Sequence, residues 1–190
     1  FEICYRTAGA TLKEWGKGEG TLAEQLSASI DEKTAAVSYV FGPWMSCGLS
    51  LREVVEIAHE KNVPVIVDAA AMLPPADNLT HYIAEGADLV TFSGGKGLRG
   101  PQSTGILAGR ADLVEAARLN MSPHASVGRG SKVAKEEIAA VLAALKRFVS
   151  IDHEAEWATW RTWSETIAAV GSGRDGLRTV IEDGDPNRQG

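Results

Sequence analysis

Residues 63–68, with the sequence Val-Pro-Val-Ile-Val-Asp, constrain the fold of this chain more than any other segment. A run of apolar residues that ends on a carboxylate is typical of a strand buried on both faces, as in a parallel sheet. Similar short apolar runs lie at 35–40, 87–92 and 104–109, separated by segments with helical periodicity. Strands that alternate with helices predict an α/β fold, a three-layer sandwich with a mainly parallel sheet.

Two of the expected helices begin at capping boxes, in which a hydroxyl residue caps the helix and a glutamate three residues later reaches back. These pairs are Thr21 with Glu24 and Ser50 with Glu53. The other expected elements are a strand at 1–5 and helices at 81–85, 111–119 and 135–151. Two apolar stripes are expected to face the core: Leu51, Val54, Val55 and Ala58, and then Ile138, Val141, Leu142, Leu145 and Val149.

The character of the chain changes after Ile151, where three tryptophans follow at intervals of three residues. This spacing predicts a helix face that packs on another element. We expect residues 1–150 to form a large domain that lacks its N-terminal part. Residues 151–190 are expected to begin a small C-terminal domain that is also truncated. The three tryptophans named at the start of this change in character are Trp157, Trp160 and Trp163.

The charge and the cysteines narrow the possible functions. The net charge is -6, with acidic and basic residues interspersed, and this disfavours binding to duplex nucleic acid. Cys4 and Cys47 show neither CxxC nor metal-ligand spacing, so both are interpreted as reduced, buried or half-buried thiols, and no metal site is expected. No segment resembles a signal peptide or a membrane span, which favours a cytoplasmic protein.

The stretch from 93 to 109 is the densest in glycine, and three interpretations of it compete. Gly95, Gly97 and Gly100 fit the dinucleotide-binding pattern G-x-G-x-x-G, but that pattern must open a helix, and here Pro101 and a strand follow. The P-loop pattern fails because it requires a glycine five residues before Gly95 and a hydroxyl residue directly after the lysine. The third interpretation is a lysine held in a glycine-lined turn.

That lysine is Lys96, and Asp68 lies at the end of a neighbouring predicted strand. An amine can capture the aldehyde of pyridoxal 5′-phosphate (PLP), and a buried carboxylate keeps the ring nitrogen protonated. Residues 69–71 are alanines that would let a flat ring lie close, and Ser93 could hold a phosphate. Taken alone, Lys96 could equally be a surface lysine and Asp68 a turn former. Together they predict a PLP site.

Several stretches resemble the selenocysteine-synthase-like family of fold-type-I PLP enzymes, the branch of L-seryl-tRNA(Sec) selenium transferase and D-glucosaminate-6-phosphate ammonia-lyase. These stretches are 64–75, 86–90, 93–96, 100–102 and 128–138. The resemblance implies that Lys96 forms the Schiff base with PLP and that Asp68 pairs with the pyridine nitrogen. It also implies that Ser93 contacts the phosphate and that Ala70 packs against the ring.

The resemblance further implies that Arg129 and Lys132 are basic residues near the active-site entrance, where substrate binds. The expected activity is that of a lyase or transferase: an amino-acid substrate loses its Cα proton, and a group at Cβ is eliminated or replaced. A homo-oligomer is expected, since fold-type-I sites are usually built across a dimer interface. A tRNA partner is not indicated by this part of the chain. A non-catalytic nucleotide-binding domain and an inactive fragment remain as alternatives.

Overall fold

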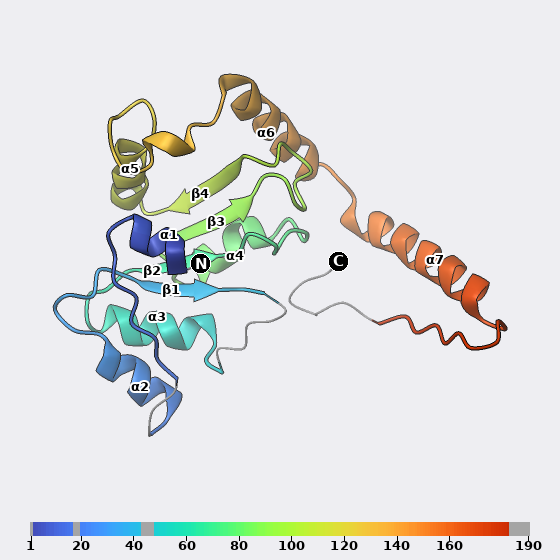
Figure 1. Cartoon of the computed structure of the whole chain (residues 1–190), viewed down its shortest axis with the longest axis horizontal. Helices are drawn as coiled ribbons and strands as arrows, with labels where there is room; N and C mark the ends of the chain where they lie inside the picture. The colour runs from blue at the N-terminus through green and yellow to red at the C-terminus, as the bar shows by residue number, and fades with distance from the viewer. Residues whose placement is uncertain (1, 17–19, 43–47, 183–190) are drawn as a thin grey trace.

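The computed structural model describes residues 2–16, 20–42 and 48–182, and they form an α/β fold (Figure 1). The strands of its sheet lie in the order β1 (Val37–Val40), β2 (Val65–Asp68), β3 (Leu89–Ser93) and β4 (Gly105–Gly109). The first three strands are parallel, whereas β4 runs antiparallel to β3. The predicted α/β class with a mainly parallel sheet is therefore confirmed, with one antiparallel strand beside β3.

Both predicted capping boxes are present, at the starts of α2 (Leu22–Ser29) and α3 (Leu51–His59). In each box the cap hydroxyl accepts a hydrogen bond from the backbone N–H of the glutamate, whose carboxylate accepts one from the N–H of the cap residue. All residues of the stripe predicted for α3 are buried: Leu51, Val54, Val55 and Ala58. This stripe holds α3 against β2.

The remaining helices are α4 (Asn78–Ala84), α5 (Ala111–Asn120), α6 (Lys135–Phe148), α7 (His153–Gly171) and the 3-10 turn η1 (Arg129–Ser131). α3 and α4 each connect two parallel neighbours in the sheet, and right-handed crossovers place both on the same face. The first helix, α1 (Glu2–Thr7), reaches the other face, since its Tyr5 hydroxyl lies 2.5 Å from the Ser38 hydroxyl of β1. Helices therefore contact both faces of the sheet.

The strand predicted for residues 1–5 is wrong, because residues 2–5 belong to α1. Arg6 forms an ion pair with Glu2 at 2.7 Å, and the Thr7 hydroxyl donates to the Ile3 carbonyl, both across one helical turn. A strand requires a neighbour for its backbone groups, whereas a helix satisfies them internally. The residue types of this segment favour a strand, but the local i,i+4 contacts form instead. Cys4 is exposed in α1, against expectation, and Cys47 lies outside the described residues.

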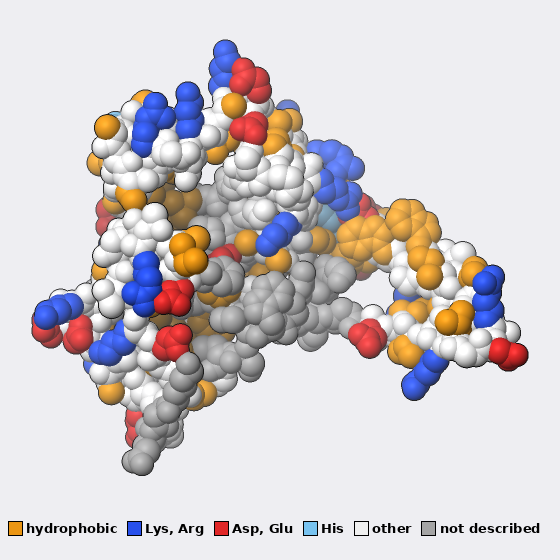
Figure 2. Space-filling view, viewed as in Figure 1, with side chains coloured by type: hydrophobic (Ala, Val, Ile, Leu, Met, Phe, Trp, Pro, Cys, Tyr) orange, Lys and Arg blue, Asp and Glu red, His pale blue; other side chains and the backbone are white. Residues whose placement is uncertain are grey.

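The apolar stripe predicted for α6 is only partly correct. Val141 is buried, but Ile138, Leu142 and Val149 are exposed, and the buried residue near the end of the helix is Phe148. Since the next element, α7, extends away from the body of the molecule (Figure 1), it leaves this side of α6 uncovered. Figure 2 shows hydrophobic side chains at the surface along the upper right of the molecule, over α6 and the base of α7.

The prediction for the tryptophans of α7 is likewise correct only in part. Trp157 and Trp160 are half-buried near the base of the helix, whereas Trp163 is 60% exposed. The helical period of the three residues is right, but no described element covers the outer part of α7. The described helices include none that is both long and apolar enough to cross a membrane.

A buried carboxylate joins the elements at the amino ends of β2 and β3. Asp88 is 5% exposed; its Oδ2 accepts the Val65 backbone N–H at 2.7 Å and lies 2.8 Å from His59 Nε2. Its Oδ1 accepts a hydrogen bond from Arg110 at 3.0 Å. Burial raises the pKa of Asp88, but the hydrogen bonds from His59, Val65 and Arg110 outweigh burial and hold the pKa below its usual value. Asp88 therefore stays ionised and binds three elements together.

Candidate active site

The predicted site residues lie at the opposite edge of the sheet, where β2 and β3 end. Asp68 is the last residue of β2 and stands in register with Thr91 of β3. Ser93 is the last residue of β3, and Lys96 follows three residues later. In open α/β sheets, ligands bind beyond the carboxyl ends of the strands. The fold therefore brings Asp68, Ser93 and Lys96 to the edge at which a ligand is expected.

Asp68 is held by the turn that follows it. One carboxylate oxygen, Oδ1, accepts the backbone N–H of Ala70 at 3.0 Å, and the Asp68 carbonyl accepts the N–H of Phe41 at 2.9 Å. Within the described parts of the chain, its other oxygen, Oδ2, accepts no hydrogen bond. The side chain is half-buried. Asp68 thus offers one oriented carboxylate oxygen at the end of β2 that no described residue binds.

The alanines after Asp68 cross the end of β3. The Ala69 N–H donates to the Thr91 carbonyl at 3.0 Å, and the Ser93 N–H donates to the Ala70 carbonyl at 3.4 Å. These two bonds continue the ladder with β3 beyond the end of β2. Ala70 therefore lies beside Ser93, as a site that contains both residues requires.

Lys96 sits in a closed turn whose ends are tied together by backbone hydrogen bonds. The Gly94 N–H donates to the Thr104 carbonyl at 2.8 Å, and the Gly100 N–H donates to the Gly94 carbonyl at 2.7 Å. The Gln102 side chain closes the turn further by donating to the Gly95 carbonyl at 3.0 Å. The Lys96 side chain is exposed, and its amine has no hydrogen-bond or ion-pair partner among the residues that the structure describes.

Gly97 brings the Lys96 turn into backbone contact with the loop that begins at Asp68. A Cβ added at Gly97 would lie 2.0 Å from the carbonyl oxygen of Leu73, far inside any normal contact distance. Only a glycine lets the two segments approach so closely. The contact explains in physical terms why a glycine follows the lysine.

Substitution of Gly97 by alanine is expected to displace the turn, because the clash is with backbone atoms that cannot rotate away. We expect lower thermal stability and a loss of PLP binding by at least about tenfold, which corresponds to about 1.4 kcal/mol. Calorimetry and a PLP titration measure the two effects. Gly130→Ala is the matched control, since nothing lies within 4 Å of a Cβ added there. Unchanged PLP binding in Gly97→Ala would contradict the assigned role.

The structure also rules out the dinucleotide interpretation of the same glycines. Residues after Gly100 lead into β4, so no helix N-terminus is available here to receive a pyrophosphate. The groups present fit PLP better: among the described residues, the Lys96 amine and the second Asp68 oxygen have no partner, and Ser93 adds a hydroxyl.

Arg129 and Lys132 are not brought to this edge. Arg129 opens η1 and donates to the Ser122 hydroxyl at 3.3 Å, and Lys132 follows η1; both side chains are exposed. Figure 1 shows η1 on the side of α5, whereas the turn between β3 and β4 lies on the side of α6. Within one chain these two residues are therefore separate from Lys96, and their role in substrate binding stays a prediction.

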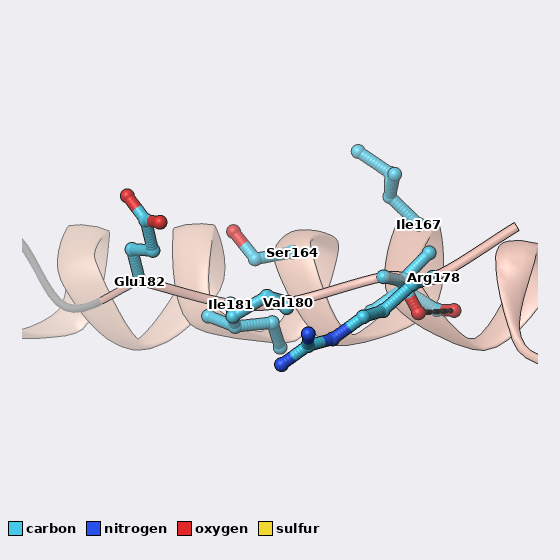
Figure 3. A pocket seen from close by; sticks show the side chains of 8 residues that line it. Ser164, Ile167, Arg178, Val180, Ile181 and Glu182 are labelled. Atoms are coloured by element: carbon cyan, nitrogen blue, oxygen red, sulfur yellow. Dashed lines mark hydrogen bonds between the residues drawn. The ribbon is translucent and has the colours of Figure 1, made fainter.

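A hollow elsewhere on the molecule contains none of the predicted site residues. It lies between α7 and the extended segment 178–182 that runs back along it (Figure 3). Thr179 ties this segment to the helix by donating to the Ala168 carbonyl at 3.1 Å. The hollow is lined by Ser164, Ile167, Ala168, Arg178, Thr179, Val180, Ile181 and Glu182. The candidate active site is therefore the edge at Asp68 and Lys96.

The α/β fold, with a lysine turn beyond one strand and an aspartate at the end of its neighbour, defines the class of fold-type-I PLP enzymes. The comparisons are more specific: the chain belongs to the SelA (L-seryl-tRNA selenium transferase) family, whose profile matches residues 2–170. The predicted family is thereby confirmed, and PLP is the cofactor of that family.

Two curated relatives and one solved structure illustrate the match. D-glucosaminate-6-phosphate ammonia lyase of Salmonella typhimurium is 30% identical over 185 residues, which cover 96% of this chain and 47% of the relative. A 5'-C-glycyluridine monooxygenase-decarboxylase of a Streptomyces species is 36% identical over 149 residues, or 77% of this chain and 35% of the relative. A solved structure of D-glucosaminate-6-phosphate ammonia-lyase superposes with a TM-score of 0.73 at 29% identity, covering 95% of this chain and 46% of that one. The chain thus spans less than half the length of these relatives.

Proposed function

We propose that the whole protein is a PLP-dependent enzyme that removes the Cα proton of an amino-acid substrate and then eliminates or replaces a group at Cβ. The observation that carries this proposal is the close contact of Gly97 with Leu73, which packs the Lys96 turn on the loop that begins at Asp68. When bound, PLP supplies an electron sink for the negative charge that develops at Cα. The choice of substrate and reaction then depends on the protein side chains that surround the bound cofactor.

Four of the predicted site residues would each have a role toward the cofactor or the substrate. The Lys96 amine would attach the cofactor covalently through its aldehyde carbon, with release of water, and after its displacement by the substrate amine would accept the Cα proton. The free Oδ2 of Asp68 would accept the ring N–H and favour its charged form. The Ser93 hydroxyl would donate to the phosphate, and Ala70 would pack against the ring.

Elimination is the outcome that we favour over replacement. A relative that matches 96% of this chain is named as an ammonia lyase, whereas the family profile is named for a selenium transferase. A third relative is named as a monooxygenase-decarboxylase, so the family includes different chemistry on related chains. A small amino-acid-like molecule is the substrate that we propose, and release of ammonia from D-glucosaminate 6-phosphate is the first activity to measure.

Self-association is part of this proposal. Several apolar side chains on α6, directly after it and on α7 are 48–72% exposed: Ile138, Leu142, Val149, Trp163 and Ile167. Exposed apolar surface of this kind commonly marks contacts with another part of a protein or with a second subunit. Sedimentation of the full-length protein at several concentrations measures the oligomeric state.

The direct test of the proposed function is chemical. Full-length protein is mixed with PLP, reduced with borohydride, digested and mapped by mass spectrometry. We expect a phosphopyridoxyl group on Lys96, and we expect Lys96→Ala to lose both this group and the visible colour of bound PLP. Lys135→Ala is the control, because that lysine is 91% exposed and lies outside the turn. Attachment to another lysine at the native level in Lys96→Ala would refute the assignment.

A further inference from the structure

The Lys96 turn is linked to α7 by a residue that the sequence did not single out. Arg99 closes the turn, and its backbone N–H donates to the Lys96 carbonyl at 2.9 Å. Its φ angle is +57°, in the left-handed region that is strained for a residue with a side chain. A strained backbone of this kind persists only where surrounding contacts hold it.

Those contacts come from α7. The guanidinium of Arg99 donates to Glu156 Oε1 at 2.8 Å and lies 5.7 Å from the centre of the Trp160 ring. Glu156 is 19% exposed, and the hydrogen bond from Arg99 holds its pKa below the usual value, so it is ionised at neutral pH. The pair therefore combines a charge-assisted hydrogen bond with a cation–π contact.

Other contacts at the base of α7 are ring contacts that lack hydrogen bonds among the described residues. The ring of His153 lies 4.5 Å from that of Phe148 and stacks at 6.3 Å on Trp157. Both ring nitrogens of His153 and the indole nitrogen of Trp157 are buried, yet none forms a hydrogen bond with the described residues. Unsatisfied buried polar atoms of this kind cost free energy. None of the residues of α7 is fully buried, and Figure 1 shows its outer turns projecting from the body.

We propose that Arg99 is a positioning residue that couples the placement of Lys96 to the seating of α7 on the body of the protein. The inference rests on the proposed role of Lys96. When Glu156 and Trp160 hold Arg99, the strained end of the turn is fixed, and with it the backbone that carries Lys96. When α7 moves away, Arg99 loses both partners, and the turn relaxes from its left-handed conformation. Attachment of PLP thus depends on α7.

Two substitutions in the full-length protein separate the effect of the Arg99–Glu156 contact, called the tether, from the effect of the strained φ angle of Arg99. Glu156→Gln removes the ionised partner and leaves the turn sequence intact. Arg99→Gly removes the tether and relieves the strained φ angle, because glycine adopts it freely. In Glu156→Gln we expect borohydride-trapped labelling of Lys96, at PLP below saturation, to slow by about tenfold, the effect of losing roughly 1.4 kcal/mol of a charged hydrogen bond. In Arg99→Gly we expect a smaller decrease, because glycine keeps the left-handed φ angle without support from α7. Arg99→Lys keeps a cation beside Glu156 and is expected to slow labelling less than Glu156→Gln does.

Hydrogen exchange gives a second readout that does not depend on PLP. Amides of residues 94–104 are expected to exchange faster in Glu156→Gln, while those of β2 keep the native rate. The matched control is Glu165→Gln, which breaks an exposed ion pair with Arg161 (3.0 Å) on the same helix. This control is expected to change neither readout.

The outcomes distinguish this inference from the proposed function. Native exchange in residues 94–104 and native labelling in Glu156→Gln would overturn the coupling. If the unsubstituted protein carries no label on Lys96, the proposed function fails, and a role of Arg99 in positioning that lysine for PLP fails with it. Faster exchange in Glu156→Gln with slower labelling in a protein that labels at Lys96 supports both.

Discussion

Replacement of Asp88 by alanine is expected to lower the free energy of unfolding by about 1–3 kcal/mol, the cost of leaving a buried hydrogen-bond donor unsatisfied. The carboxylate is 5% exposed and accepts hydrogen bonds from groups on three elements. Its loss leaves the Val65 N–H buried and unsatisfied and leaves His59 and Arg110 without their common partner. Urea unfolding at neutral pH measures the change.

Asp112→Ala is the matched control, because Asp112 binds the same arginine at 2.7 Å but is 63% exposed. We expect it to change stability little, since exposed ion pairs contribute little. An equal effect of the two substitutions would show that Arg110, and not the buried carboxylate, carries the stability.

Acid is expected to destabilise the fold by protonating the Asp88 carboxylate. The pKa of Asp88 is lower in the folded protein than its ordinary value of 3.8, so the unfolded chain binds a proton first as the pH falls. The contribution of Asp88 is therefore complete above about pH 4 and is lost as the pH drops through the lower folded pKa. Asp88→Asn should remove this part of the acid dependence, which unfolding curves recorded from neutral pH down to acid can show.

Asp68→Asn is expected to have the largest effect on chemistry. Asparagine keeps an oxygen that can accept the Ala70 N–H, so the turn is preserved, but it removes the negative charge. Loss of one group that stabilises developing charge in an active site typically costs about 10²–10³-fold in rate. We expect a decrease of this size in the exchange of the substrate Cα proton with deuterium, measured by NMR on the PLP-loaded protein.

The control for this change is Asp77→Asn, an exposed carboxylate directly before α4 that makes no side-chain capping hydrogen bond. It should exchange the Cα proton at the native rate. A native rate in Asp68→Asn, with the cofactor bound, would exclude Asp68 as the partner of the ring nitrogen.

The sequence predicted most of the features that depend on neighbouring residues. The capping boxes at Thr21 and Ser50, the buried stripe of α3 and the apolar strands all follow from short-range patterns, and all are present. The edge that carries Asp68 and Lys96 could also be predicted, because the carboxyl ends of parallel strands meet at one side of a sheet.

Apart from α1, which forms where a strand was expected, the errors and omissions concern contacts between distant segments. A helical period places Ile138 and Leu142 on one side of α6, but it does not say whether another element covers them. The partners of Asp88 lie 22–29 residues away in the chain, and Glu156 lies 57 residues from Arg99, so no local pattern links them. Such residues can be recognised only when the fold is known.

The antiparallel direction of β4 has a consequence for how this protein can vary. Ser93 pairs with Gly105 across the sheet, so residues 94–104 form a hairpin connection anchored at both ends. A single inserted residue that shifted the pairing would turn every side chain of β4 to the other face. Related chains should therefore tolerate exchanges of residue type in this segment more readily than changes in its length.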